Sequence, residues 1–300
     1  MAGGVNYRVF SPEVWSPYIK VYFKDRLYAA KFFNNFTAEL QKQGGDTITL
    51  PNLTEGPDPT SLTVTTGDLT DFIVVETRTQ LTVDAWVAQS KKFSDFEASR
   101  IMKNYNLQMR YLKGDLMPKL AKKFEQELIG QTGAVKDLQL HTGTSLVSIS
   151  NTTITEALRI AETFSMPIEE CAFFFHVNTY YKQLFRRVNV IDASQFGKAL
   201  QPAGDVRPLG VLYGVPVYVS NLVGLAQGLV EDGYPATTRR NLLVHPRTVA
   251  YAYGRLTPDG PRFQEQPVGN ALAMRIVADI MYGKALPGKA QEGIRLMTVA

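Results

Sequence analysis

Several features that define common classes of protein are missing from this sequence of 300 residues. It contains a single cysteine, Cys171, which excludes an intramolecular disulfide and is typical of a reducing compartment. Its longest apolar runs, such as Cys171–Phe175, are too short to cross a bilayer, and residues 1–10 lack the apolar stretch of a signal peptide. We therefore expect a cytosolic product that makes no membrane contact.

An excess of charge of one sign is missing as well. The sequence has 32 Lys and Arg against 28 Asp and Glu, which gives a formal net charge of +4. This excess permits contact with a polyanion, but a dedicated nucleic-acid-binding domain usually carries a much stronger concentration of positive charge. The hydrophobic content of 45% is ordinary for a folded, soluble chain of about two domains.

The motifs of the common catalytic sites are also missing. No phosphate-binding loop, dinucleotide-binding glycine motif or hydrolase nucleophile elbow occurs. The histidines His141, His176 and His245 are isolated, whereas a metal site needs at least three converging ligands. Cys171 and His176 would lie on opposite faces of a strand, so a buried thiol beside a structural histidine is the better interpretation. We predict no catalytic, cofactor or metal site.

The most distinctive feature that is present is a long alternating segment. Polar residues such as Glu76, Arg78 and Asp84 occupy its even positions, and this period of two predicts a half-buried strand. Its odd positions carry Ile73, Val75, Thr77, Thr79, Leu81, Val83, Ala85 and Val87. Extended over 73–87 it would reach about 50 Å, far more than an average strand. We expect it to project from the subunit and lie on a neighbour.

A second feature is an aromatic-rich N-terminal segment over residues 1–45. Trp15, Tyr18 and Tyr22 recur at helical spacing in a stretch with little core of its own, which indicates an arm that packs along something else. A short strand is predicted over 46–50, and the Pro, Gly and Thr content of 52–67 predicts a loop.

A third feature is a long one-faced helix. Ser94 and Glu97 match a capping box, so the helix should begin at this point. Apolar residues then follow at spacings of three or four, from Ile101 to Leu128. The helix is expected to end at Gly130 or Gly133, which gives it a length of roughly 50 Å.

Residues 134–268 indicate a compact α+β region. Its expected elements are helices over 153–164 and 178–187, strands over 172–177 and 241–244, and two strands joined at Gly214 within 211–219. The last residues predict a pair of strands, 274–283 and 294–299, that face each other across a turn.

Three segments occur in an order that carries a family resemblance. Gly45–Pro51 reads Gly-Asp-Thr-Ile-Thr-Leu-Pro, Gly214–Asn221 reads Gly-Val-Pro-Val-Tyr-Val-Ser-Asn, and Tyr282-Gly283 lies in the closing strands. Together with the arm, the long hairpin and the long helix, they make the whole chain resemble the major capsid proteins of tailed bacteriophages. That fold is shared with the encapsulin shells of bacteria. Each motif alone is weakly specific, and the order carries the resemblance.

The resemblance implies an α+β fold with an extended β-hairpin loop, a spine helix in a peripheral domain, and an α+β axial domain. The implied divisions are an N-terminal arm (1–45), an extended loop (46–92), a peripheral domain with the spine helix (93–133), an axial domain (134–268) and returning peripheral strands (269–300). The implied function is non-enzymatic: hexamers and pentamers of the chain would form an icosahedral head around double-stranded DNA, in a virion assembled in the host cytoplasm. Portal, scaffolding or decoration proteins would be further partners.

The resemblance also suggests which residues make contacts. Contacts between subunits are expected from the extended loop through Ile73, Val75, Thr77, Thr79, Leu81, Val83 and Trp86, and from the arm through Trp15, Tyr18 and Tyr22. A face toward DNA could be formed by Lys103, Arg110, Lys113, Lys119, Lys122 and Lys123. A merely solubilising face, softened by Asp115, Glu125 and Glu127, is an interpretation of nearly equal weight.

Some features of relatives should be missing here. No lysine occurs between Asp46 and Ser90, so we expect no lysine–asparagine cross-link from the extended loop. The 45 residues before the first strand leave no room for a fused scaffolding segment, so scaffolding would be separate or unnecessary. An encapsulin-like shell around a protein cargo is the alternative with the same fold. An enzyme built on 134–268, or a tail or neck protein, is a more distant alternative.

Overall fold

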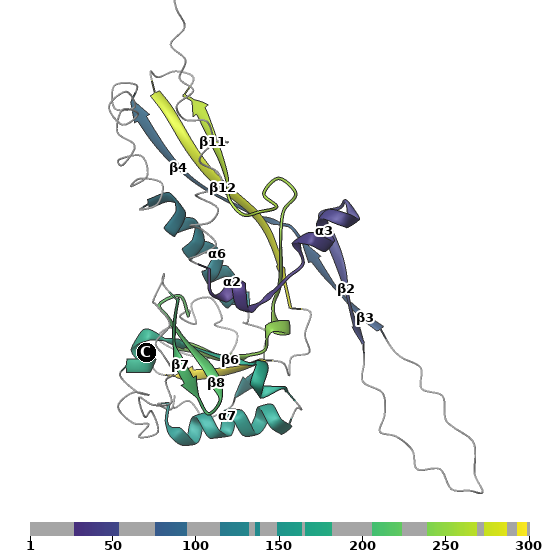
Figure 1. The fold of residues 1–300 in the computed structure, drawn as a ribbon, viewed down its shortest axis with the longest axis vertical. Coiled ribbons are helices and arrows are strands. Elements are labelled where there is room, and N and C mark those ends of the chain that lie inside the picture. The colour runs from purple at the N-terminus through teal and green to yellow at the C-terminus, as the bar shows by residue number, and fades with distance from the viewer. Residues whose placement is uncertain are drawn as a thin grey trace, which may run out of the picture.

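A computed structural model describes residues 27–53, 76–94, 115–131, 136–138, 149–163, 166–181, 206–223, 239–268, 273–286 and 293–298. These residues form two sheets at opposite ends of the subunit and a two-stranded hairpin that points away from both (Figure 1). Helices and strands are mixed along the chain, so the fold class is α+β, as expected from the sequence.

The five-stranded sheet is organised around one long strand, β12 (Ala273–Ala285). On one side β12 pairs with β4 along ten residues, and on the other it pairs first with β11 and then with β10, always antiparallel. The two-residue strand β1 adds to β10 in parallel. The bounds of these partners are β1 Asn34–Asn35, β4 Ala85–Ser94, β10 Ala250–Tyr253 and β11 Arg262–Pro267.

The six-stranded sheet has the order β5-β13-β9-β6-β8-β7. Its strands are β5 Lys136–Leu138, β6 Ala172–His176, β7 Val206–Leu212, β8 Val215–Ser220, β9 Arg239–Val244 and β13 Gly293–Thr298. Strand β6 is buried along its whole length, because Phe174 enters one hydrophobic cluster while Phe173 and Phe175 enter another. The second cluster is closed by helix α7 (Asn151–Thr163), which lies along the sheet in Figure 1.

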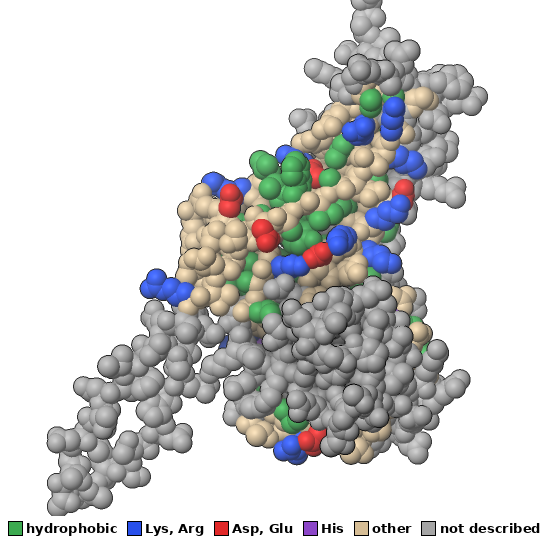
Figure 2. Space-filling model, turned by 180° about the vertical axis from the view of Figure 1, so that it is seen from behind, with side chains coloured by type: hydrophobic (Ala, Val, Ile, Leu, Met, Phe, Trp, Pro, Cys, Tyr) green, Lys and Arg blue, Asp and Glu red, His purple; other side chains and the backbone are tan. Residues whose placement is uncertain are grey.

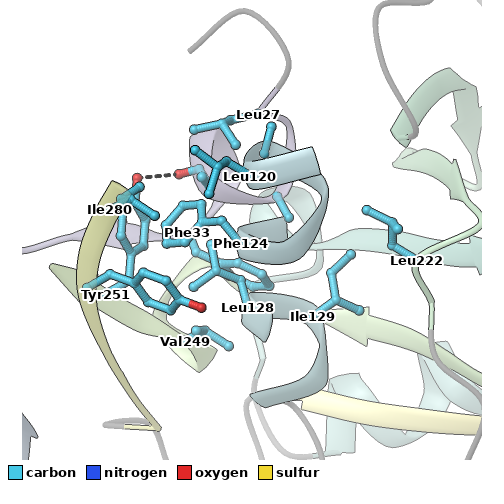
Figure 3. Close-up of a cluster of buried hydrophobic side chains, with 14 of the residues drawn as sticks. Leu27, Phe33, Leu120, Phe124, Leu128, Ile129, Leu222, Val249, Tyr251 and Ile280 are labelled. Carbon is cyan, nitrogen blue, oxygen red and sulfur yellow. Dashed lines mark hydrogen bonds between the residues drawn. The ribbon is translucent and has the colours of Figure 1, made fainter. Parts of the chain in front are cut away.

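The main hydrophobic cluster is centred on helix α6 (Met117–Gln131). Leu120, Phe124 and Leu128 repeat every four residues and are buried, so they form one apolar stripe. The Phe124 ring lies 4.8 Å from the ring centroid of Tyr282 and 5.6 Å from that of Tyr251. Figure 3 shows Phe124 near the centre of the labelled side chains, close to Phe33 and Leu128, with Leu222 of the six-stranded sheet region beyond Ile129. One cluster thus joins both sheets.

The projecting hairpin is made of β2 (Thr47–Leu53) and β3 (Glu76–Thr82), which pair antiparallel from Thr47↔Thr82 to Leu53↔Glu76. Its base is anchored by a small cluster in which Leu81 packs with Leu40 of helix α3 (Thr37–Gln43). Where the chain leaves β3 it crosses directly over Gly283 of β12. A Cβ atom at Gly283 would lie 2.2 Å from the carbonyl oxygen of Thr82, so no side chain can stand there.

The predicted strand over 73–87 is two strands in two different sheets. Its alternation is confirmed from residue 78 to residue 92, where odd positions are buried or half-buried and even positions exposed. The chain turns at Val83 and Asp84, however, so β3 belongs to the projecting hairpin and β4 to the five-stranded sheet. The extended loop predicted over 46–92 therefore has to end near residue 82.

Two other boundaries predicted from the sequence are also wrong. The strands of the expected C-terminal pair, β12 and β13, belong to different sheets, and β10 and β11 belong with β12 rather than with the strands of 134–244. In the N-terminal segment, Leu27, Ala29, Ala30 and Phe33 are buried in the chain's own core, so only residues before 27, which lie outside the described ones, remain candidates for a free arm.

The helix predicted to end near Gly130 extends to Gln131 with Gly130 inside it. Ser94, where its start was predicted, is the last residue of strand β4, and residues 95–114 lie outside the described part. Helix α7, strand β6, strand β9 and the pair β7–β8 confirm the predictions for their segments. The helix predicted over 178–187 begins as the short α8 (Val177–Thr179), and its later residues lie outside the described part.

Replacing Gly283 with alanine should destabilise the subunit, because the new methyl group would displace the backbone of Thr82. We expect the free energy of unfolding in urea to fall by about 3 kcal/mol. The control is Gly130→Ala in α6, where nothing lies within 4 Å of an added Cβ atom. That substitution should raise stability by about 0.5–1 kcal/mol, since alanine favours helix. Equal effects of the two substitutions would contradict the close crossing.

Candidate assembly surfaces

The outer face of the five-stranded sheet, on the side away from α6, is the most unusual surface of the subunit. We define this outer face by Trp86 and Lys92 of β4 and by Val277 and Met281 of β12, together with the residues of the two strands that point to the same side. Trp86 is 67% exposed, although its strand β4 is paired with the long strand β12, where Met281 stands opposite it. Figure 2 views the molecule from behind and shows hydrophobic side chains gathered among basic ones on the part that holds this sheet. Aromatic groups held on a rigid surface are typical of protein interfaces.

Trp86 is held in place by a buried carboxylate. Its indole Nε1 donates to Asp279 Oδ2 at 3.0 Å, across from β4 to β12. Arg262 of β11 donates to the same carboxylate twice, from Nε at 3.1 Å and from Nη2 at 2.7 Å. The Asp279 side chain is only 2% exposed, so the carboxylate at the centre of this three-strand network is shielded from solvent and fixes the orientation of the exposed ring.

The outer face also carries an unfavourable pair of like charges. Lys92 and Arg275 stand directly opposite each other in the antiparallel ladder of β4 and β12. Both are exposed, and neither forms an ion pair within the described residues. Like charges at directly opposed positions destabilise a sheet. An anionic group bound on this face would relieve the repulsion.

The predicted contacts of the extended loop fall in several places. Leu81 has no exposed surface and packs in its own subunit, so it cannot reach a neighbour. Thr79 and Val83 are half-buried at the base of the hairpin, and Thr77 lies on β3. Outside the described residues lie Ile73 and Val75 of the loop and Trp15, Tyr18 and Tyr22 of the arm.

The basic residues of the long helix are partly neutralised. Lys119 pairs with Asp115 at 2.6 Å and Lys123 with Glu127 at 2.7 Å, each one helical turn apart. Lys284 of β12 also contacts Glu127. Lys122 is exposed. Lys103, Arg110 and Lys113 lie outside the described residues, so the continuous basic face toward DNA stays a prediction.

The cysteine and histidine side chains that were considered for catalysis make structural contacts instead. Burial raises the pKa of the Cys171 thiol to about 12, and the thiol donates to the Pro167 carbonyl, so it is not a nucleophile at neutral pH. His245 accepts from the backbone N–H of Arg247 through Nδ1 and contacts Glu170 through Nε2, at the junction of β9 and β10. The described residues contain no cluster of three potential metal ligands, and none of their helices could span a membrane.

Two buried carboxylates of this structure were not recognised in the sequence. Asp279 falls within the strand predicted over 274–283 and has no predicted role of its own, and Glu125 belongs to the solubilising face considered for the long helix. Glu125 is instead buried, and its carboxylate accepts from the backbone N–H groups of Ala29 and Ala30. The sequence signal for each is its position: Glu125 directly follows Phe124 of the apolar stripe, and Asp279 interrupts the apolar run from Ile276 to Tyr282.

Removing the charge of Asp279 should loosen the outer face. An amide at this position offers one acceptor oxygen to three donors, so Asp279→Asn loses part of the hydrogen bonding to Arg262 and Trp86 and places an amide N–H₂ group against these donors. We expect the free energy of unfolding to fall by about 1–3 kcal/mol in urea titrations. Glu156→Gln, which removes a fully exposed ion pair with Arg159, should leave the unfolding midpoint unchanged. A stable Asp279→Asn variant would mean that the network contributes little.

Comparison with known proteins gives a consistent result for the fold. No protein-family model matches the sequence, and a comparison with curated proteins finds no match. Among solved structures, the capsid of Ralstonia phage GP4 aligns with a TM-score of 0.65 at 11% identity, covering 90% of this chain and 87% of that chain. A structure from Mycobacterium phage Che8 gives 0.62 at 13% identity, with 90% of both chains covered. The capsid of the native GTA particle gives 0.59 at 12% identity, covering 90% of this chain and 89% of the other. Across nearly its whole length, the chain has the fold of a tailed-phage capsid protein.

Proposed function

We propose that this chain is a major capsid protein that assembles into hexamers and pentamers, and that these close an icosahedral head around double-stranded DNA. The observation that carries the proposal is the likeness to phage and GTA capsid structures over about 90% of the chain. The role is structural and needs no catalytic group. The six-stranded sheet would correspond to the axial domain, and the five-stranded sheet with α6 to the peripheral domain.

The shape of the subunit supports self-assembly. The hairpin β2–β3 projects from the body, and both its strands have an unpaired edge in the described structure (Figure 1). Unpaired edges and exposed aromatic rings such as Trp86 are liabilities for a monomer. In a ring of identical subunits each copy can cover these features of its neighbour, and every such contact is repeated around the ring.

Charge complementarity suggests where the hairpin of one copy would lie. The sequence between β2 and β3, residues 54–75, carries Glu55, Asp58, Asp68 and Asp71 but no lysine or arginine. The outer face of the five-stranded sheet carries the opposed Lys92 and Arg275, on the same face as Trp86 but farther along β4. We infer that the acidic segment of one copy covers the basic outer face of the next. The predicted contacts of Ile73, Val75 and Trp86 would be part of this interface.

Further partners follow from the proposal. DNA would be enclosed without sequence recognition, and the mild positive charge of the chain, +4, is in keeping with contacts to phosphates alone. A portal and a separate scaffolding or decoration protein would complete the particle. An encapsulin-like shell around a protein cargo is the alternative. The solved structures named above come from phage and GTA particles, which favours the nucleic-acid interpretation.

Shortening the hairpin should abolish assembly without unfolding the subunit. Leu53 and Glu76 are directly opposed, so an Asn-Gly turn can replace residues 54–75 and close the hairpin after this pair. This change retains Leu81, which a wider deletion of 52–85 would remove from the core. The full chain should form rings or closed particles in negative-stain electron microscopy and light scattering. The shortened chain should give a monodisperse folded monomer. Particles of normal size from the shortened chain would contradict the proposal.

Reversing charges should test the proposed interface. The double variant Lys92→Glu, Arg275→Glu should fail to form particles at low salt, because two carboxylates would then face an acidic segment. Adding Glu55→Lys, Asp58→Lys, Asp68→Lys and Asp71→Lys to that variant should restore particles. Lys42→Glu with Lys122→Glu makes the same change of net charge elsewhere and should assemble normally. Normal assembly of the first variant would contradict this placement of the hairpin.

A further inference from the structure

Glu125 is a charged group in a position where charges are rarely found. Its side chain is only 2% exposed, within the cluster that contains Phe124, Tyr251 and Tyr253. The described residues place no lysine or arginine in ion-pair contact with it. Burying an ionised carboxylate without a cationic partner costs several kcal/mol, so a protein usually either pairs such a group or keeps it neutral.

Among the described residues, the hydrogen-bond donors to this carboxylate belong to the N-terminal segment. Oε2 accepts from the Ala29 N–H at 2.8 Å, and Oε1 accepts from the Ala30 N–H at 3.1 Å, at the start of the four-residue helix α2 (Ala29–Phe32). Glu125 therefore joins α6 directly to the backbone of residues 27–33, the segment that connects residues 1–26 to the body of the subunit.

The same segment is held by further contacts that do not depend on charge. The Tyr251 hydroxyl donates to the Ala30 carbonyl at 2.9 Å. Phe33 stacks on Phe174 of the six-stranded sheet with ring centroids 6.1 Å apart, and Figure 3 shows Phe33 facing the same cluster as Phe124. Residues 27–33 thus lie where α6 and both sheets meet, so loosening of this segment would affect the whole central packing.

The surroundings of Glu125 offer no strong compensation for its charge. From α2, Lys31 is exposed and lies over the Tyr28 ring, 5.5 Å from the centroid, and it acts on Glu125 only at a distance. From β10, Tyr251 and Tyr253 face the carboxylate, and burial together with this charge raises the pKa of both phenols, so both are neutral. On α6 itself, Glu127 is engaged by Lys123 and Lys284.

We propose that Glu125 is a proton-controlled latch for the N-terminal segment. Residues 27–33 are docked firmly while the carboxyl group carries a proton, and they loosen when the group ionises. A neutral carboxyl group still accepts a backbone N–H bond through its carbonyl oxygen and avoids the cost of a buried charge. An ionised group gains solvation if the segment moves away and water enters.

The direction and size of the effect follow from the pKa. Burial raises the pKa of Glu125 to about 7 from an ordinary value of 4.5, against the smaller opposite effect of the backbone N–H groups. The docked state therefore binds a proton more tightly than an undocked, solvated state. Its advantage is full below pH 4.5 and is lost as the pH rises through 7. Between pH 6 and pH 8 the docking equilibrium should weaken about tenfold.

Hydrogen exchange tests the latch on the full-length chain. Protection factors for the amides of residues 27–33, corrected for the intrinsic rate at each pH, should fall about tenfold between pH 6 and pH 8. In Glu125→Gln, which is neutral at every pH, protection should be independent of pH over this range. The matched control Glu127→Gln, two residues along the same helix, should keep the pH dependence of the unaltered chain.

Two results would overturn the proposal: constant protection in the unaltered chain, or an unchanged pH dependence in Glu125→Gln. Should Glu125→Gln fail to fold, infrared spectroscopy of the unaltered chain gives a separate answer. A buried neutral carboxyl band should be present at pH 6 and disappear with a midpoint near pH 7. Its absence at pH 6 would show that Glu125 is already ionised and would refute the latch.

One consequence rests on the proposed function. Since residues 1–26 directly precede this segment in the sequence, particle formation should also change between pH 6 and pH 8 in the unaltered chain and not in Glu125→Gln. The exchange measurement needs no particles. If the chain forms none at any pH while the exchange result holds, the capsid proposal fails and the latch stands.

Discussion

Burial of helix α6 on more than one side is the constraint on which the remaining structure depends. Its stripe of Leu120, Phe124 and Leu128 packs in one cluster with β10, β12, α2 and residues of the six-stranded sheet. Burying a side chain of the size of phenylalanine contributes about 1.5–3 kcal/mol, so this stripe supplies much of the free energy that holds the two sheets together. Because the same cluster includes Ala29 and Phe33, residues 27–33 are part of this core and not an appendage to it.

That packing also determines which surfaces remain for other molecules. The five-stranded sheet has only one face toward α6, so the other face of β4, β11 and β12 is open to solvent, and its alternating pattern places Trp86 and Lys92 there. In the six-stranded sheet the central strand β6 has apolar clusters on both faces. The two ends of the subunit therefore differ in character: one presents a sheet face, and the other is closed. This difference supports placing the proposed contact with a neighbour on the five-stranded sheet.

Patterns in the sequence correctly predicted the features that depend only on neighbouring residues. The alternation from residue 78 to residue 92 is correct because each side chain's face depends on its own strand, and the pair joined at Gly214 is correct because Tyr213 and Gly214 both have positive φ, as a tight hairpin turn requires. Which strands pair was less predictable. The partner of β13 is β9, about fifty residues earlier, and nothing in either strand specifies the other. The break at Val83 and Asp84 was missed for a similar reason: it exists because β12 offers a glycine for the crossing, two hundred residues away.

The two buried carboxylates show why burial alone does not define a structural charge. Asp279 lies between a guanidinium group and an indole N–H, so its charge is compensated by an opposite charge as well as by hydrogen bonds. Glu125 is buried to the same extent but receives only backbone N–H groups of a short helix, whose hydrogen bonds oppose the cost of burial without matching it. A carboxylate of the first kind fixes a surface in one geometry. A carboxylate of the second kind stands near the balance between its two protonation states, and its position on the only described link to residues 1–26 gives that balance a structural consequence.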